Sequence, residues 1–153
     1  KKKTVLEIGI GTGRIAKKVA PSCFRLTGID ISPKTIERAK INLRAYSNID
    51  YLCADFLRYP FACTYDVIYS SLTMIHFENK QKVIEKVDSL LNNAGKFCLS
   101  IDKNQSEYID MGVRKLRVYP DTVDNIVPLI SKTSMKIDMI HEIEFAFLIS
   151  CRK

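Results

Sequence analysis

Residues 7–13 read Glu-Ile-Gly-Ile-Gly-Thr-Gly, and they close the apolar run of residues 4–8. A short apolar run bounded by a turn signal predicts a buried strand. Glycine is needed where the backbone takes angles closed to other residues, or where a ligand touches the main chain. A helix expected over residues 13–20 would direct its first N–H groups at the same turn. This stretch therefore predicts a strand, a ligand-holding glycine turn and a helix, in that order.

The rest of the chain continues this alternation of short apolar runs and longer segments of helical period. Further strands are expected at residues 24–29, 49–53, 66–70 and 96–101, and further helices at residues 32–45 and 78–91. Such alternation is the signature of an α/β fold with a mainly parallel sheet. Two last runs, 136–143 and 145–151, are separated by too little chain for a crossover helix, so they should pair antiparallel. The sequence predicts a Rossmann-like, doubly wound, mostly parallel seven-stranded sheet that ends in an antiparallel hairpin.

Prolines and polar stretches refine this outline. Ser32 should cap the second helix, with Pro33 in its first turn, where a missing N–H costs nothing. Pro21 should stop the first helix, and Pro128 should kink or divide a helical segment over residues 120–132. Residues 103–118 are polar and weakly patterned, so the sequence leaves open whether they form a lid.

Length and composition fit a single globular domain. The chain has 153 residues, of which 46% are hydrophobic and 27% charged, and one core suffices at this size. No stretch has the roughly 20 apolar residues that a membrane span needs. The lysines at positions 1–3 precede an apolar run, but Glu7 interrupts it and no cleavage site follows, so a signal peptide is disfavoured. We expect no membrane partner.

The five cysteines, at positions 23, 53, 63, 98 and 151, form no C-x-x-C pair, and only two histidines are present. The sequence therefore predicts no metal site and favours a reducing, cytoplasmic setting. Cys53, Cys98 and Cys151 fall in predicted strands, where cysteine usually behaves as a small buried apolar residue.

The formal charge of +7 raises the question of nucleic acid. Lys and Arg are mostly dispersed along the sequence, and the only groupings are residues 1–3 and residues 114–117. No aromatic ladder accompanies them. A lysine-rich solvated surface explains the charge, so nucleic acid is possible as a partner but not favoured. The sequence does not indicate an oligomeric state.

Two carboxylates follow the next two predicted strands. Asp30 ends the second strand, where it can accept hydrogen bonds from a ribose diol. Asp55 and Phe56 end the third, and offer a carboxylate for an exocyclic amine, a backbone N–H and an aromatic face, which are the contacts an adenine ring uses. Each aspartate alone could equally cap a turn. Ligands of open parallel sheets bind outside the carboxyl ends of the strands, so the combination predicts a nucleoside site.

Taken in order, these motifs resemble those of the class I S-adenosylmethionine-dependent methyltransferase family over nearly the whole chain. The matching segments are VLEIGIGTGRIAKKV (5–19), GIDIS (28–32), CADF (53–56), YDVIYSSLTMIHF (65–77), GKFCLSI (95–101) and MKIDMIHEIEFAFLISCRK (135–153). The family usually carries a helical segment before its first strand, and this chain starts almost at that strand. The resemblance thus implies one domain over residues 1–153 that lacks the usual substrate-capping segment.

The resemblance implies S-adenosylmethionine as the cofactor and assigns residues to it. Those around its methionine half would be Gly9, Gly11 and Gly13, with Glu7 bracing the turn. Those around its nucleoside would be Asp30 on the ribose, Ile31 against the adenine, Asp55 on the adenine amino group and Phe56 through its backbone. Ser71, with its neighbours at 70, 72 and 73, would face the methyl group.

A sulfonium methyl is already activated, so the enzyme must mainly hold an acceptor atom in line with the S–CH3 bond. His76 is the only histidine placed to act as a base, the alternative being a structural residue that anchors its loop. His141 alternates with apolar neighbours on a strand and should lie at the surface.

The methyl acceptor follows by elimination. Residues 70–73 lack the Asn or Asp, two prolines and aromatic residue of enzymes that methylate exocyclic amines of bases. The end of the fourth strand lacks the acidic ligand of metal-dependent catechol enzymes, and no Pro-Cys pair suggests a cytosine nucleophile. A small organic molecule is left as the acceptor.

The alternatives to a methyltransferase are a non-catalytic S-adenosylmethionine-binding or RNA-associated partner domain, and a nicotinamide-dependent oxidoreductase. The last is disfavoured because Arg14 stands where the dinucleotide fingerprint needs its third glycine.

Overall fold

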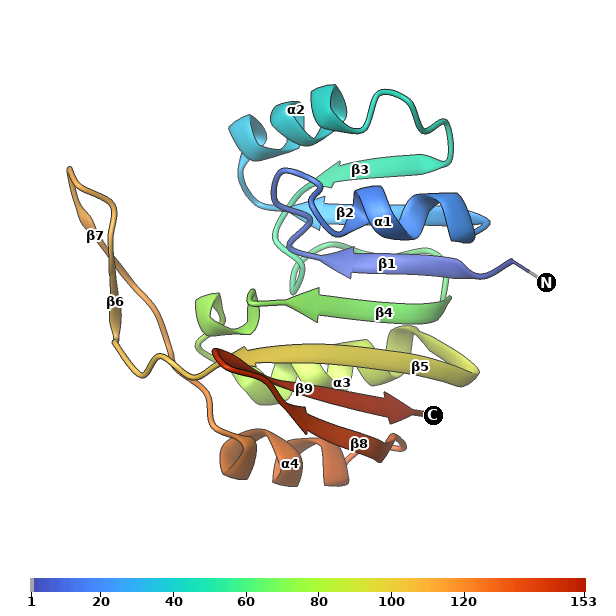
Figure 1. The fold of residues 1–153 in the computed structure, drawn as a ribbon. Helices are drawn as coiled ribbons and strands as arrows, with labels where there is room; N and C mark the ends of the chain where they lie inside the picture. The colour runs from blue at the N-terminus through green and yellow to red at the C-terminus, as the bar shows by residue number, and fades with distance from the viewer. Residues whose placement is uncertain (1) are drawn as a thin grey trace.

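The computed structural model describes residues 2–153, which form one twisted seven-stranded sheet and a thin two-stranded projection (Figure 1). The sheet order is β3-β2-β1-β4-β5-β9-β8. Its strands are β1 (Thr4–Ile8), β2 (Arg25–Asp30), β3 (Ile49–Cys53), β4 (Tyr65–Ser71), β5 (Leu91–Asp102), β8 (Lys136–Glu142) and β9 (Ala146–Arg152). Pairing is parallel from β3 to β5, and β9 runs antiparallel to β5 and β8. The predicted mostly parallel sheet with a closing antiparallel hairpin is confirmed.

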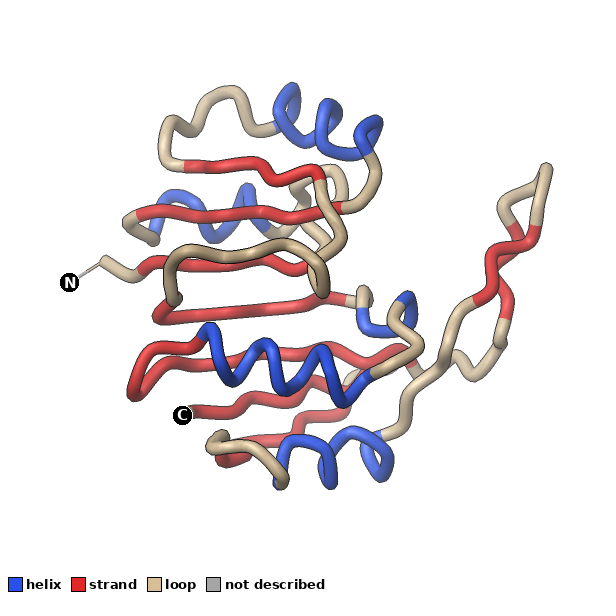
Figure 2. Tube along the Cα trace, turned by 180° about the vertical axis from the view of Figure 1, so that it is seen from behind, coloured by secondary structure: helices blue, strands red, loops and turns tan. Residues whose placement is uncertain are grey.

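Helices cover both faces of the sheet (Figures 1 and 2). They are α1 (Ala16–Val19), α2 (Pro33–Asn42), α3 (Lys80–Leu90) and α4 (Val123–Ser131), with short 3-10 turns η1 (Ala20–Ser22) and η2 (Met74–His76). One buried cluster takes its helical residues from α1 and α2, and the other from α3 and α4. The two separate cores are what a doubly wound sheet requires, because each face must be buried against its own helices.

Most predicted helix signals are confirmed, with shifts at the ends. The Ser32 hydroxyl accepts the Thr35 N–H at 3.3 Å as the N-cap of α2, and Pro33 is its first residue. The first helix begins at Ala16 and not at the predicted Gly13, because Gly13 has φ +88°, outside the helical region. Pro128 lies inside α4, which continues through it.

The fifth strand begins earlier than predicted. The sequence predicts that residues 92–95 close a helix and that the strand starts at residue 96. Instead β5 starts at Leu91, which pairs with Tyr65 in β4, and the register then shifts so that Val67 pairs with Lys96. Leu91 is buried, so its side chain is held against the sheet as soon as α3 ends. This pairing is a tertiary contact that local turn residues do not reveal.

Residues 103–121, hereafter the arm, leave the end of β5 and return to α4. They contain a two-stranded ribbon of β6 (Tyr108–Asp110) and β7 (Lys115–Arg117), turned at Gly112 with φ +78°. Figure 1 shows the arm projecting beyond the carboxyl ends of the parallel strands. The sequence predicts no strands in this segment, since three-residue strands give no periodic signal.

The cysteine predictions are partly wrong. Cys151 is buried as expected, but Cys53 and Cys98 are exposed, while Cys23, outside the predicted strands, is buried. Within residues 2–153 all five thiols are free and no group of side chains could hold a metal ion. No helix of the described residues is long and apolar enough to cross a membrane.

Candidate functional site

Three glycines with positive φ form the turn after β1, and they differ in what surrounds them. A Cβ on Gly9 (φ +74°) would lie 2.3 Å from Oγ1 of Thr73, and one on Gly13 would lie 2.5 Å from Cδ1 of Leu43. A Cβ on Gly11 (φ +56°) would meet no atom within 4 Å. Gly9 and Gly13 are therefore required for packing as well as for conformation. Gly11 faces open space, where a ligand can approach the main chain.

Asp30, at the end of β2, is tied to this turn. One carboxylate oxygen accepts the Gly11 N–H at 3.0 Å, and the other accepts the Ser32 N–H at 3.0 Å. An ionised carboxylate has about four acceptor sites, so both oxygens keep one for a ligand hydroxyl. The adjacent Ile31 is 71% exposed, so a large apolar side chain stands uncovered beside the carboxylate. An apolar ring laid against Ile31 would remove that surface from water.

The end of β3 lies directly beside the end of β2. The Ala54 N–H donates to the Asp30 carbonyl at 3.0 Å, which brings the next residue, Asp55, to the same edge. The Asp55 carboxylate accepts the Leu57 N–H at 2.8 Å and keeps one oxygen 3.7 Å from Nε of Arg58. The Asp55 side chain thus caps the following turn and remains partly exposed. The structure brings together the two carboxylates that the sequence predicts as nucleoside ligands.

Phe56 does not present the aromatic face that the sequence suggests. Its ring is buried and packs against Phe61 and Phe77, with centroid distances of 5.7 and 6.2 Å, while the Lys86 ammonium lies 5.4 Å from the ring centre. Large aromatic rings are buried wherever a core can accept them. Only the backbone of Phe56 is left for a ligand at this edge.

Glu7 is buried beneath the glycine turn. The Tyr69 hydroxyl donates to its carboxylate at 2.8 Å, and the two residues are register partners on β1 and β4. Burial raises the pKa of Glu7 to about 7, although the Tyr69 hydrogen bond and the nearby Arg14 charge act against the rise. The sequence singles out Glu7 but not Tyr69, because the partner comes from a strand more than sixty residues away.

The loop after β4 is held in an uncommon conformation against the glycine turn. Leu72 has φ +53°, and its N–H donates to the Ser100 hydroxyl at 2.8 Å. A non-glycine residue in this region costs about 1–3 kcal/mol and is concentrated at functional sites. The Ser70 hydroxyl is buried and has no hydrogen-bond partner among the described residues. Ser71 lies 3.4 Å from Ser100, hydroxyl to hydroxyl, at the end of the strand.

His76 is the last residue of η2, which follows this loop. The side chain of His76 is exposed, and its backbone N–H donates to the Thr73 carbonyl at 3.0 Å. Partial desolvation lowers the pKa of His76, the positive charge of Lys80 lowers it further, and Asp30 acts in the opposite direction. A lowered pKa keeps the imidazole in its basic form at neutral pH. His141 is exposed on β8, as predicted.

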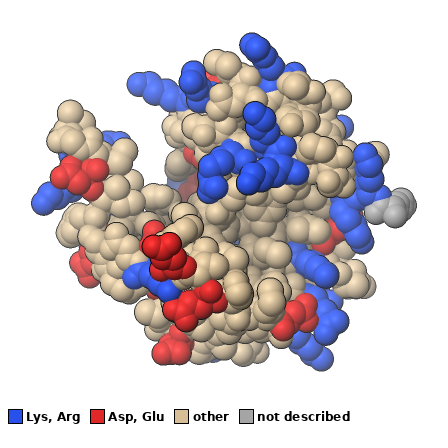
Figure 3. All heavy atoms as spheres, viewed as in Figure 1, with Lys and Arg blue, Asp and Glu red and all other residues tan. Residues whose placement is uncertain are grey.

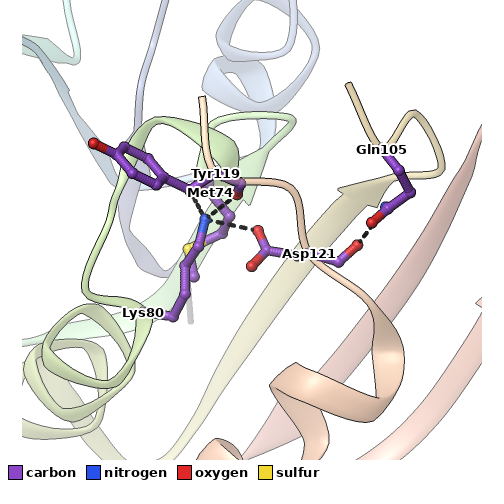
Figure 4. Close-up of polar contacts among 5 residues, drawn as sticks. All are labelled: Met74, Lys80, Gln105, Tyr119 and Asp121. Atoms are coloured by element: carbon purple, nitrogen blue, oxygen red, sulfur yellow. Dashed lines mark hydrogen bonds and ion pairs between the residues drawn. The ribbon is translucent and has the colours of Figure 1, made fainter. Parts of the chain in front are cut away.

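Lys80, at the start of α3, joins the loop to the base of the arm (Figure 4). Its ammonium donates to the carbonyls of Met74 and Tyr119 and to the Asp121 carboxylate, the last at 2.9 Å. Sequence reasoning missed both Lys80 and Asp121. No local signal marks them, because a lysine in a first helical turn and an aspartate before a helix are common at the surface.

Basic residues that are dispersed in the sequence gather in space. On α1 and α2 the only acid is Glu37, which pairs with Lys40 at 2.8 Å, while the exposed basic side chains of these helices are Lys17, Lys18, Lys34, Arg38 and Lys40. Figure 3 shows Lys and Arg over this part of the molecule, and a hollow between it and the arm. The carboxyl edge of the sheet thus opens into a recess with a basic flank on the side of α2.

Two other cavities lie away from the carboxyl edge. One is lined by residues that include Lys2, Phe24 and Tyr46, at the amino edge of the sheet, and the other by residues of the 130–137 segment. Neither includes Gly11, Asp30 or Asp55. The grouping of these residues therefore rests on the hydrogen bonds between their strand ends and on the open space at Gly11.

Comparison with known proteins identifies the family. Residues 5–95 match the family model described as "Methyltransferase domain". An uncharacterized methyltransferase of Alkaliphilus oremlandii is 34% identical over 104 residues, 67% of this chain and 47% of that protein. Malonyl-(acyl-carrier protein) O-methyltransferase 1 of Ilyobacter polytropus is 28% identical over 110 residues, 71% of this chain and 41% of that protein. The chain thus spans less than half the length of these curated relatives.

Solved structures share the fold over the whole chain. A putative S-adenosylmethionine-dependent methyltransferase from Listeria monocytogenes superposes with a TM-score of 0.86 at 18% identity, covering 100% of this chain and 90% of that one. The N-methyltransferase NodS from Bradyrhizobium japonicum, in complex with S-adenosyl-L-homocysteine, has a TM-score of 0.80 at 20% identity, covering 99% and 78%.

Proposed function

The chain belongs to the class I S-adenosylmethionine-dependent methyltransferase family, and from this premise we propose that it binds S-adenosylmethionine and transfers the methyl group to a small organic molecule. The observation that carries the proposal is the set of hydrogen bonds that join Gly11, Asp30 and Ala54 at one edge of the sheet. They gather an open main-chain turn and two carboxylates where a single nucleoside could touch them all.

The residues present fit this cofactor. Gly11 has no neighbour where a Cβ would stand, which leaves room for the methionine half against the main chain. Both oxygens of Asp30 keep an acceptor site for the ribose hydroxyls. Ile31 supplies an exposed apolar surface for the adenine, and Asp55 a carboxylate for its amino group. The glycine turn is shaped from beneath by Gly9, Gly13 and Glu7, which do not face its open side.

The chain's own residues would mainly orient the reactants. When bound, S-adenosylmethionine supplies a methyl group that is already activated on a sulfonium. The loop of residues 70–73 holds its strained shape through Ser100 and through the contact of Thr73 with Gly9, so it offers a fixed surface beside the methionine half. Holding two reactants in a productive geometry is itself a large part of catalysis.

His76 is our candidate for a base where the acceptor must lose a proton. Desolvation lowers its pKa and so favours the neutral imidazole that a base needs, and His76 follows the loop of residues 70–73 that we place beside the methionine half. A base contributes about 10²–10⁴-fold to a proton-transfer step and nothing to an acceptor that needs none. His76 therefore matters for a hydroxyl or protonated amine acceptor, and not for a carboxylate.

The small-molecule acceptor is supported by the relatives. Their names include malonyl-(acyl-carrier protein) O-methyltransferase, ubiquinone biosynthesis O-methyltransferase and, among structures, an N-methyltransferase. These relatives differ in acceptor atom, and the family model matches residues 5–95, which include every residue that we assign to the donor. We infer that the donor site is the common element, and that the arm, which lies outside residues 5–95, chooses the acceptor.

Two measurements test the proposal in sequence. Calorimetric titration with S-adenosyl-L-homocysteine should show saturable binding to the wild-type chain, and nicotinamide dinucleotides should give no heat of binding. Incubation with methyl-labelled S-adenosylmethionine and a panel of carboxylic acids, phenols and amines should then label a small molecule. Label found only in RNA or protein would overturn the acceptor class, and the absence of binding would overturn the donor assignment.

A further inference from the structure

One side chain, Lys80, holds together two segments that are distant in the sequence (Figure 4). On one side it donates to the Met74 carbonyl, in the loop after β4. On the other it donates to the Tyr119 carbonyl at 2.7 Å and to the Asp121 carboxylate at 2.9 Å, both at the return of the arm. An ammonium has three protons to donate, and here three acceptors receive them. Any relative movement of loop and arm must break at least one of these bonds.

The contact is buried, although it lies at the root of an exposed projection. The side chains of Lys80 and Asp121 are 13% and 2% exposed. Burial lowers the pKa of Lys80 and raises the pKa of Asp121, in both cases against the effect of the partner's charge. Desolvation of this kind makes a buried ion pair a weak source of stability, and such pairs can be retained because they fix one arrangement. We therefore expect the pair to fix the arrangement of the loop and the arm more than to stabilise the fold.

The same segments continue to the donor site on one side and into the arm on the other. Thr73 packs on Gly9 of the glycine turn, and the Ile75 carbonyl accepts the Tyr119 N–H at 2.7 Å. The Gln105 amide donates to the Asp121 carbonyl at 2.9 Å, which adds the segment that leads out to β6. A continuous run of contacts thus leads from the glycine turn, through residues 73–75 and Lys80, to both sides of the arm base.

We propose that Lys80 is a positioning residue for methyl transfer, which locks the loop after β4 to the base of the arm. Binding of the donor at the glycine turn then fixes the position of the arm. The arm in turn forms the surface against which the acceptor is oriented. This inference rests on the proposed function, since it needs a donor in the glycine turn. Lys80 itself touches neither reactant and acts through Met74, Tyr119 and Asp121.

Hydrogen exchange measured by mass spectrometry tests the coupling without a known acceptor. In the wild-type chain, S-adenosyl-L-homocysteine should slow amide exchange at residues 9–13 and also at residues 117–121. The double variant K80M/D121L replaces the pair with apolar side chains, which buried sites often accept without loss of stability. In that variant residues 117–121 should exchange about tenfold faster and no longer respond to the ligand, while residues 9–13 still do.

Three further variants separate positioning from a general structural role. Lys80→Arg keeps donors for the same acceptors, so residues 117–121 should still respond to the ligand in this variant. Lys82→Met removes a neighbouring exposed lysine of α3 and should behave as wild type. Gln105→Ala cuts only the outer contact at Asp121 and should weaken the response without altering the fold, so it serves as the test if the double variant does not fold.

Two results would overturn the inference. One is a wild-type chain in which the ligand protects residues 9–13 but leaves residues 117–121 unchanged. The other is an arm response that persists in K80M/D121L. Both differ from failure of the proposed function, which would show as no protection of residues 9–13 in the wild-type chain and would remove the premise of the inference as well.

Discussion

The carboxyl edge of the sheet has two halves, the ends of β1 to β3 and the end of β4, and they are built in different ways. At the ends of β1, β2 and β3, the groups that we assign to the donor lie on short connections after each strand, and the hydrogen bonds from Gly11 and Ala54 to Asp30 join adjacent strands. At the end of β4 the loop depends on Ser100 of β5, on Lys80 of α3 and on the arm. The first half is local. The second is assembled from distant segments, which is where differences in acceptor can arise.

The largest loss of stability is expected where Gly9, in the first half, contacts Thr73, in the second. Gly9→Val places a side chain at φ +74° and into Thr73, whose Oγ1 would lie 2.3 Å from the new Cβ. Backbone strain and overpacking together should lower the free energy of unfolding by about 2–5 kcal/mol. Chemical denaturation measures this. The matched control is Gly11→Ala, which shares the positive φ but meets no atom, and should cost only about 1 kcal/mol while weakening donor binding. Equal losses of stability would refute the contact between the halves.

The stability of the fold should depend on pH through Glu7, which is buried beneath the glycine turn. Burial raises the pKa of Glu7 from 4.5 to about 7, so between these values the folded state holds a proton that the unfolded state has released. Unfolding then takes place with loss of a proton, and stability should fall as the pH rises from about 4.5 to 7, by up to about 3 kcal/mol. Urea titrations across this range should show the slope in wild type and a flatter profile in Glu7→Gln, which still accepts from Tyr69. An identical slope in both would assign it to other groups.

Donor binding should depend most strongly on the first half. Asp30→Ala removes hydrogen bonds from a charged acceptor and should weaken S-adenosyl-L-homocysteine binding by about 1.5–3 kcal/mol. Calorimetry provides the measurement. Asp124→Ala, at an exposed aspartate in the first turn of α4, is the control and should leave the affinity unchanged. An unchanged affinity in Asp30→Ala would mean that the ribose lies elsewhere.

The smallest effect is expected at the tip of the arm. Val113 is 97% exposed, and exposed positions rarely change stability by more than about 0.5 kcal/mol. Val113→Ser should therefore leave both unfolding and donor binding as in wild type, while altering the rate with any acceptor that reaches the arm. A loss of donor affinity in this variant would show that the exposed tip of the arm, and not only its base, is coupled to the donor site.

Sequence reasoning succeeded where function is carried by short local patterns. The glycine turn, the Ser32 cap and the carboxylates of Asp30 and Asp55 each follow a predicted strand or begin a predicted helix, and the structure places them accordingly. It failed where a side chain's environment depends on remote chain. Phe56 turned into the core, Cys53 and Cys98 stayed exposed, and the start of β5 was set by its pairing with Tyr65.

By itself, the sequence determined the mostly parallel sheet, the order of its main elements along the chain and the strand ends that carry Gly11, Asp30 and Asp55, because apolar period, glycine and proline act within a few residues. The tertiary structure alone decided that Tyr69 meets Glu7, that Leu72 is strained over Ser100, and that Lys80 joins the loop to the arm. Those contacts link residues roughly thirty to sixty positions apart in the chain. Only packing decides which distant polar groups share a buried space, since a polar group withdrawn from water must find its partner wherever the fold supplies one.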